Sequence, residues 1–215
     1  MKSELTIMNS TTIFSTPIWQ TEYPHFEENK AQFIQAIRDL KEKYPEGVKK
    51  SNLFGYHSHE RIHEEDSRIH PLLHYVGEMA VKAAEDLGFI SVDVALTSVW
   101  FNINDTRQCM NAEHTHGDTF SGVFYLKAPE DSGKLVLQNP GINRLWQGLS
   151  LLEKKNQFTG EKISITPVEG NIIMFPSYLP YWVEPNDHDD ERISISFNAI
   201  CLPEGSIGTP HQNAE

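Results

Sequence analysis

The segment Arg192-Ile-Ser-Ile-Ser-Phe-Asn198 alternates polar and apolar side chains. Because neighbouring side chains of an extended strand point to opposite faces, this pattern predicts a strand with one polar and one apolar face. A strand with one face in solvent has the same pattern. If the polar face instead lines the inside of a barrel, Arg192 and Ser194 suit a small dicarboxylate, because a guanidinium pairs with a carboxylate through two parallel hydrogen bonds.

Similar short runs of β-branched and aromatic residues, separated by turn residues, precede this segment. They predict a mainly β protein, an all-β sandwich or jelly roll, with strands over residues 92–103, 120–126, 134–137, 162–166, 171–175, 182–184 and 192–200. Upstream, apolar residues recur at helical spacing and predict helices over residues 27–43 and 69–87.

We expect one domain. Its N-terminal part, residues 1–90, holds an early strand over residues 12–19, the two helices and a loop over residues 51–67. The jelly-roll core occupies residues 91–202, and residues 203–215 form a tail. An insertion over residues 143–159 has no clear strand pattern and is typical of a lid or a dimer contact.

Composition excludes several classes of function. Acidic residues exceed basic residues by 30 to 18, which gives a net charge of −12 and argues against nucleic acid and anionic membranes as partners. Cys109 and Cys201 lie far apart, which excludes a disulfide framework and a cysteine-rich zinc site. The sequence contains no apolar run of signal-peptide or membrane-span length, so we expect a cytoplasmic protein.

The motif Glu113-His114-Thr115-His116-Gly117-Asp118 lies just before the expected strand at Phe120. Side chains two residues apart in an extended chain share a face, so His114 with His116, or His116 with Asp118, can converge on one point. Imidazole nitrogens with a carboxylate suit Fe(II), Mn(II) or Zn(II). The alternative is that these histidines lie on the surface beside a turn.

Three motifs occur in a fixed order along the chain. They are His114-x-His116 followed by Ser121-Gly-Val-Phe-Tyr-Leu126, then Gly170 with Phe175-Pro-Ser177, then Arg192-x-Ser194 with Ser196-Phe-Asn198. In this order they resemble the 2-oxoglutarate- and Fe(II)-dependent oxygenase superfamily, and in particular a small branch from bacteria and phages. The resemblance extends from Ser51 to Asn198.

The resemblance implies a double-stranded β-helix, a cupin-like jelly roll with the N-terminal helices packed on its outside. It implies Fe(II) and 2-oxoglutarate as cofactors, and hydroxylation of a peptide side chain or a small metabolite. Arg192 and Ser194 would hold the distal carboxylate of 2-oxoglutarate. Tyr125 and Asn102 are further candidates for the same cavity. By analogy with other barrels of this kind, the protein is expected to form a homodimer.

One position departs from the superfamily pattern. Where the superfamily has a second, distal histidine ligand, this sequence has Tyr181. Three alternatives follow: Tyr181 ligates as a phenolate, Asp118 completes the set if Gly117 bends the chain, or water takes the third position. If the metal site is incomplete, the chain is a degenerate family member, or a cupin-like metal-binding protein that does not oxidise 2-oxoglutarate.

Overall fold

The computed structural model describes residues 15–105, 109–141 and 160–206. The helical elements are α1 (Phe26–Lys43), α2 (Ile62–Glu65), the 3-10 turn η1 (Ser67–Ile69) and α3 (His70–Asp86). The strands are β1 (Trp19–Glu22), β2 (Asn52–Leu53), β3 (Tyr56–His57), β4 (Val92–Asn104), β5 (Met110–His114), β6 (Phe120–Lys127), β7 (Leu135–Gln138), β8 (Lys162–Ile165), β9 (Asn171–Pro176), β10 (Tyr181–Val183) and β11 (Arg192–Pro203).

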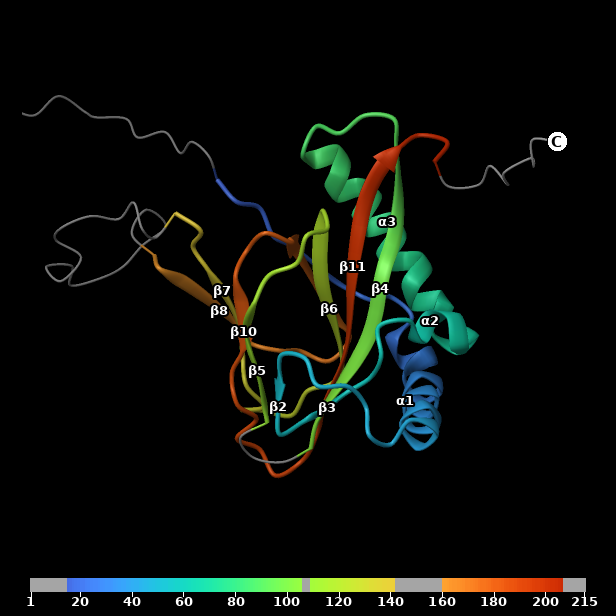
Figure 1. Cartoon of the computed structure of the whole chain (residues 1–215), viewed down its shortest axis with the longest axis vertical. Coiled ribbons are helices and arrows are strands. Elements are labelled where there is room, and N and C mark those ends of the chain that lie inside the picture. Colours follow the sequence, from blue (N-terminus) through green and yellow to red (C-terminus); the bar gives the residue numbers. More distant parts are fainter. Residues whose placement is uncertain (1–14, 106–108, 142–159, 207–215) are drawn as a thin grey trace, which may run out of the picture.

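The strands form two antiparallel sheets that lie apart in Figure 1. The larger sheet has the strand order β1-β9-β6-β11-β4-β3, and the smaller has the order β2-β5-β10-β7-β8. The expected mainly β fold is therefore confirmed. Consecutive strands such as β9, β10 and β11 alternate between the sheets, which brings residues from the whole second half of the chain to the space between them.

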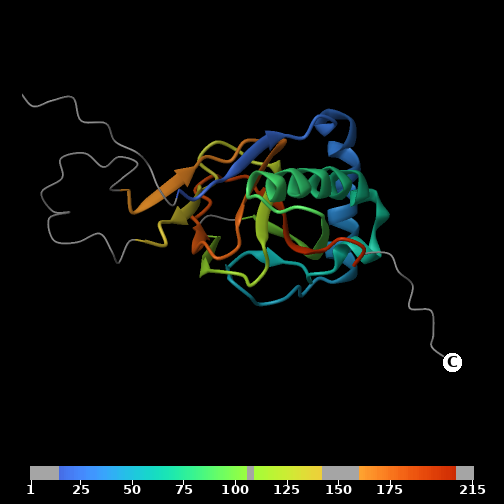
Figure 2. The same ribbon diagram turned by 90° about the horizontal axis from the view of Figure 1, so that it is seen from above.

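The helices cover the outer face of the larger sheet (Figures 1 and 2). Helix α3 contacts β4, and α1 contacts β6. The main hydrophobic core lies in this layer: Phe33 and Ile37 of α1 and Val76 of α3 are fully buried with the apolar face of the sheet. No helix of the described residues is long and apolar enough to cross a membrane.

Strand β11 lies in the middle of the larger sheet, between β4 and β6. Its apolar residues Ile193, Ile195 and Phe197 belong to the main core under the helices. Because side chains alternate along a strand, Arg192, Ser194, Ser196 and Asn198 face the other sheet. The predicted two-faced strand is correct, and its polar face is inside the molecule rather than in solvent.

Most expected elements agree with the structure to within a few residues, but three regions differ. The expected strand over residues 12–19 lies partly outside the described residues; within them, residues 15–18 form no strand, and β1 spans Trp19–Glu22. The expected loop 51–67 contains β2, β3 and α2, and β5 precedes the expected strand at Phe120. Strands β2 and β3 have only two residues each, and β5 has the sequence Met-Asn-Ala-Glu-His. None of them shows a clear alternation of polar and apolar residues. The sequence therefore did not predict them, because pairing with neighbouring strands rather than local propensity forms them. The expected insertion 143–159 lies outside the described residues.

Candidate active site

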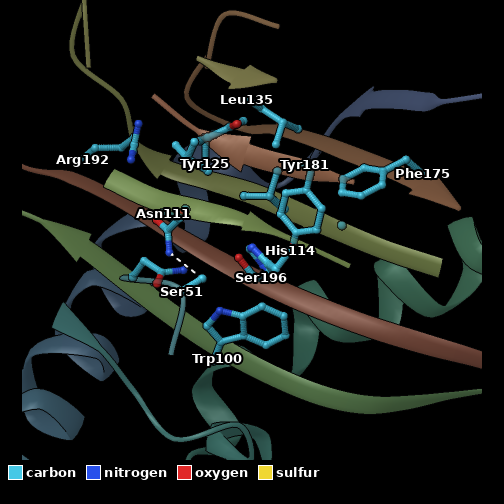
Figure 3. A pocket seen from close by; sticks show the side chains of 15 residues that line it. Ser51, Trp100, Asn111, His114, Tyr125, Leu135, Phe175, Tyr181, Arg192 and Ser196 are labelled. Atoms are coloured by element: carbon cyan, nitrogen blue, oxygen red, sulfur yellow. Dashed lines mark hydrogen bonds between the residues drawn. The ribbon is translucent and has the colours of Figure 1, made fainter. Parts of the chain in front are cut away.

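A cavity of about 480 Å³, counting the space that opens to solvent, lies between the two sheets. Residues of both sheets line it, from β4, β6, β9 and β11 on one side and β5, β7 and β10 on the other. Figure 3 shows it from close by. Six side chains singled out from the sequence are among its lining residues: Asn102, His114, Tyr125, Tyr181, Arg192 and Ser194. Residues far apart in the sequence therefore share one cavity.

The guanidinium of Arg192 lies at one end of this cavity, where it is 1% exposed. Its Nη1 donates hydrogen bonds to the backbone carbonyls of Ser132 and Gly133. No carboxylate of the described residues forms an ion pair with it. Burial lowers the pKa of Arg192 to about 10, so the group is still a cation at neutral pH. A buried cation without a counter-ion costs several kcal/mol, and a bound carboxylate would offset this cost.

Polar side chains beside Arg192 can complete such a carboxylate site. Ser194 is the cross-strand partner of Asn102 on β4 and of Tyr125 on β6, so these three residues form one row across the sheet. Burial raises the pKa of Tyr125 to about 12, which keeps its hydroxyl protonated and able to donate. The buried Oδ1 of Asn102 has no hydrogen-bond partner among the described residues. That oxygen is an acceptor, so the donors that fit a carboxylate ligand are the guanidinium of Arg192 and the hydroxyls of Ser194 and Tyr125.

His114 and Tyr181 lie together elsewhere in the cavity (Figure 3). They are cross-strand partners on β5 and β10, and their ring centroids are 4.2 Å apart. The ring of His116, in the loop after β5, is 5.2 Å from that of His114. Nε2 of His116 is 3.1 Å from the hydroxyl oxygen of Tyr181. The two imidazoles and the phenol therefore converge.

Both imidazoles are held in the neutral form that binds metals. Burial lowers the pKa of His114 and of His116. His114 Nδ1 is 2.7 Å from the carbonyl oxygen of Ala112. Because a carbonyl oxygen only accepts, Nδ1 carries the proton and donates it, which leaves Nε2 of His114 with a free lone pair.

The described residues do not offer a clear third metal ligand beside the two histidines. Burial raises the pKa of Tyr181 well above its ordinary value, so this side chain is a neutral phenol in the absence of a metal. The carboxylate of Asp118 accepts a hydrogen bond of 2.7 Å from the Thr97 hydroxyl and does not line the cavity. Within the described residues, no three His, Cys, Asp or Glu side chains are grouped to hold a metal ion.

Asp118 is therefore not grouped with the two histidines as a third ligand among the described residues, and its carboxylate is hydrogen-bonded to Thr97 instead. The remaining donors, two imidazole nitrogens and a phenol oxygen, are of the N and O types that iron accepts. They fit an iron ion if Tyr181 becomes a phenolate on binding or if water takes its place. The cavity as a whole fits a carboxylate ligand more completely than it fits a metal with three protein ligands.

Several lining residues were not expected from the sequence. Trp100, within the expected strand 92–103, lines the cavity. His57, within the expected loop 51–67, is 3% exposed and stacks on Trp100, with 5.7 Å between ring centroids. Ser51 and Asn111 line the cavity and are hydrogen-bonded to each other (Figure 3). Trp100 and Ser196 are cross-strand partners, as Asn102 and Ser194 are. Each lies two residues from a predicted site residue on its strand, so side-chain alternation could have predicted that they face the cavity. No pattern in the sequence predicted this for His57.

Residues 98–198 match the model of a family described as "Putative 2OG-Fe(II) oxygenase". The matched residues include both histidines, Tyr181 and Arg192. The predicted resemblance to the 2-oxoglutarate- and Fe(II)-dependent oxygenases is thereby confirmed over this part of the chain. No curated protein matches the sequence.

Solved structures with the same architecture include a prolyl-4-hydroxylase from Pseudomonas putida, with 15% identity, a TM-score of 0.58, and coverage of 89% of this chain and 95% of that chain. The epimerase SnoN of nogalamycin biosynthesis, in complex with Fe3+, alpha ketoglutarate and nogalamycin RO, has 13% identity, a TM-score of 0.64, and coverage of 93% and 88%. A prolyl hydroxylase from Trichoplax adhaerens, in complex with a peptide fragment, has 15% identity, a TM-score of 0.60, and coverage of 85% and 83%. These likenesses establish the double-stranded β-helix fold.

Proposed function

Since residues 98–198 match the 2-oxoglutarate- and Fe(II)-dependent oxygenases, we propose that the protein is a dioxygenase of this kind, which hydroxylates a peptide side chain or a small metabolite. One observation carries the proposal. The buried guanidinium of Arg192, without a carboxylate partner among the described residues, lines the same cavity as His114 and Tyr181. A dicarboxylate held by Arg192 would therefore lie in the cavity into which His114 opens, with the ring of His116 5.2 Å from that of His114.

In this proposal, the protein contributes binding and orientation. Arg192, Ser194 and the Tyr125 hydroxyl hold the distal carboxylate of 2-oxoglutarate, and Asn102 faces the same ligand. His114 and His116 present imidazole nitrogens to iron, with Tyr181 or water beside them. Fe(II) and 2-oxoglutarate, when bound, would supply the oxidising chemistry for a C–H bond of the substrate. Phe175 and Leu135 in the wall exclude water from part of the cavity.

We infer the substrate class from the net charge of the chain and from the ligands of similar structures. A chain with a net charge of −12 repels the phosphate backbone, so a free nucleic acid is a poor substrate. Among the similar structures, one has a peptide fragment bound and one has nogalamycin RO bound. We propose a peptide side chain or a small metabolite for this protein on the same basis.

A second candidate function is supported by the state of Tyr181. A neutral phenol stands where a third ligand is needed, and the described residues offer no acidic side chain in its place. On this alternative, the protein is a degenerate family member that binds a dicarboxylate or a partner without oxidising it. On this alternative, Arg192 still binds the dicarboxylate, but the protein binds no metal ion.

Anaerobic titration with Fe(II) and then 2-oxoglutarate separates the two functions. The dioxygenase is expected to bind iron and to show a visible charge-transfer band when 2-oxoglutarate chelates that iron. His116→Ala should lose the band and lose iron on dialysis, whereas Asp118→Asn, at the carboxylate outside the cavity, should keep both. Binding of 2-oxoglutarate without iron would establish the degenerate function. Absence of 2-oxoglutarate binding would refute both functions.

A further inference from the structure

His116 belongs to a closed ring of hydrogen bonds behind the proposed metal site. Its Nδ1 is 3.1 Å from the amide nitrogen of Asn198, and the amide oxygen of Asn198 accepts from the Ser121 hydroxyl at 2.8 Å. The Ser121 hydroxyl is 2.8 Å from that of Ser177. The carbonyl of Ser177 accepts from the backbone N–H of His116 at 3.1 Å and closes the ring.

The three side chains behind His116 are shielded from water. Asn198 is 3% exposed, Ser121 is 1% exposed and Ser177 is fully buried. Because buried polar groups must find their partners within the protein, the position of each proton in the ring depends on its neighbours. The ring therefore determines which nitrogen of His116 carries the imidazole proton.

The arrangement in the structure leaves His116 unable to bind a metal through Nε2. The amide N–H of Asn198 donates to Nδ1, so the proton of the neutral imidazole is on Nε2, where it is donated to the Tyr181 hydroxyl. A metal ligand needs a free lone pair on Nε2, and hence a proton on Nδ1.

Rotation of the Asn198 amide by half a turn gives the opposite arrangement with no bond lost. The amide oxygen then accepts from Nδ1 of His116, the amide nitrogen donates to the Ser121 hydroxyl, and that hydroxyl donates to Ser177. Serine hydroxyls can reverse in this way because they both donate and accept. His114 has no such freedom, because its Nδ1 faces the carbonyl of Ala112.

We propose that Asn198 is a positioning residue whose amide orientation selects the proton-bearing nitrogen of His116, and thereby controls the capture of a metal ion by that histidine. The inference rests on the metal site of the proposed function. Asn198 lies on β11 two residues beyond Ser196, so the strand that begins with Arg192 also carries, at its middle, the residue that orients this metal ligand.

The tautomer of His116 can be measured without a metal, by the 15N chemical shifts of its ring nitrogens in the metal-free protein. We expect the proton on Nε2 in the wild type. Asn198→Asp offers only acceptor oxygens and is expected to move the proton to Nδ1. Asn29→Asp makes the same change on α1, where Asn29 is hydrogen-bonded to Tyr23 rather than to His116; it is the matched control and should leave the tautomer unchanged. An unchanged tautomer in Asn198→Asp would refute the inference.

Titration with Zn(II), a diamagnetic probe, tests the consequence for metal capture. On binding, His116 of the wild type is expected to carry its proton on Nδ1. Asn198→Leu buries that N–H without an acceptor and should weaken Zn(II) binding about 10- to 100-fold, while Asn198→Asp and Asn29→Asp retain it. If Asn198→Leu does not fold, the tautomer of His116 in Asn198→Asp decides. Equal Zn(II) affinity in wild type, Leu and Asp variants would overturn the inference.

The two proposals fail in different ways. If the wild type binds no Zn(II), the metal site of the proposed function is wrong. Metal capture by His116 is then also refuted, whichever nitrogen carries the proton. If the wild type binds Zn(II) and the Asn198 variants change neither tautomer nor affinity, the metal site stands and only the role of Asn198 is refuted.

Discussion

The hydroxyl oxygen of Tyr181 lies 3.1 Å from Nε2 of His116, the nitrogen that a metal ligand has to present. In the arrangement that the structure has, this nitrogen carries the imidazole proton and donates it to the phenol, so it has no lone pair free for a metal ion. Tyr181 also packs against His114 across the strand pair. In the proposed metal site, the side chain at position 181 would therefore influence how strongly the two histidines hold a metal.

Tyr181→His should raise metal affinity, because it replaces a neutral phenol with a third imidazole. We expect Fe(II) or Zn(II) to bind at least about 10-fold more tightly, in line with the energy of an added ligand, and 2-oxoglutarate turnover to rise with it. Dialysis followed by metal analysis measures the affinity. Tyr181→Phe is the control: a loss of affinity in this variant would identify Tyr181 as a ligand, and an unchanged affinity would identify water at the third position. A Tyr181→His variant without gain would contradict the proposed site.

Arg192→Lys should weaken 2-oxoglutarate binding by about 10- to 100-fold, the value of a charge-assisted hydrogen bond pair. Lysine keeps the charge but lacks the fork of donors that also binds the carbonyls of Ser132 and Gly133. Calorimetric titration with 2-oxoglutarate measures the change. Arg38→Lys, in an ion pair with Glu191 at the edge of the helical layer, is the matched control and should bind like the wild type. Full affinity in Arg192→Lys would exclude the proposed role.

Gly133→Ala should cost stability and 2-oxoglutarate affinity together. Gly133 has φ +87°, and a Cβ there would collide with the carbonyls of Glu184 and Pro185 and lie 2.9 Å from Nη1 of Arg192. Gly88→Ala is the control, because Gly88 has a similar φ of +85° with open space around it. The backbone strain alone costs about 1–2 kcal/mol, which we expect for Gly88→Ala with unchanged ligand binding. Denaturant unfolding should show a larger loss for Gly133→Ala, and equal losses in both variants would contradict the close packing of this turn against Arg192.

The free energy of unfolding should fall as the pH decreases below neutral. Burial lowers the pKa of His57 in the folded state, while the unfolded chain has the ordinary value of about 6.5. The unfolded state therefore binds more protons, and stability is lost from about pH 6.5 downward until the folded pKa is passed. Burial shifts His114 and His116 in the same direction.

Urea unfolding at several pH values between about 5 and 8 measures this dependence. His57→Gln should reduce the slope, because it removes one buried imidazole. His74→Gln, at an exposed position of α3, serves as the control and should leave the slope as in the wild type. A stability that is constant or rises on acidification would contradict the prediction.

The sequence predicted the strands of the core because their alternation is local. The segment 192–198 showed a polar and an apolar face, and the structure has these faces at the cavity and at the main core. Long helices such as α1 could be predicted equally well, because a helix that packs on a protein core has apolar residues at helical spacing along one face. The short strands β2, β3 and β5 were not predicted, because they exist only through pairing: β2 with β5, β3 with β4, and β5 with β10.

The candidate site was predictable in composition but not in geometry. The residue types for a carboxylate and for a metal were evident at Arg192, Ser194, His114 and His116. Nothing local placed His57 under Trp100, took Asp118 away to Thr97, or joined Asn198 to His116. Each of these contacts links residues at least 21 positions apart, and the pairing and packing of strands that are distant in the sequence creates them.

The amino-acid sequence by itself determined the β-rich core, the helical cover, the kinds of chemical group available and the odd tyrosine at position 181. Only the tertiary structure decided that the guanidinium of Arg192 is buried without a carboxylate partner among the described residues. It also decided that the Tyr181 hydroxyl contacts the imidazole of His116, and that the amide of Asn198 is hydrogen-bonded to the other nitrogen of that ring. The physical reason is range: side-chain alternation and helical spacing are properties of neighbouring residues, whereas the burial of a charge and the direction of a hydrogen bond depend on which distant strands fold against one another.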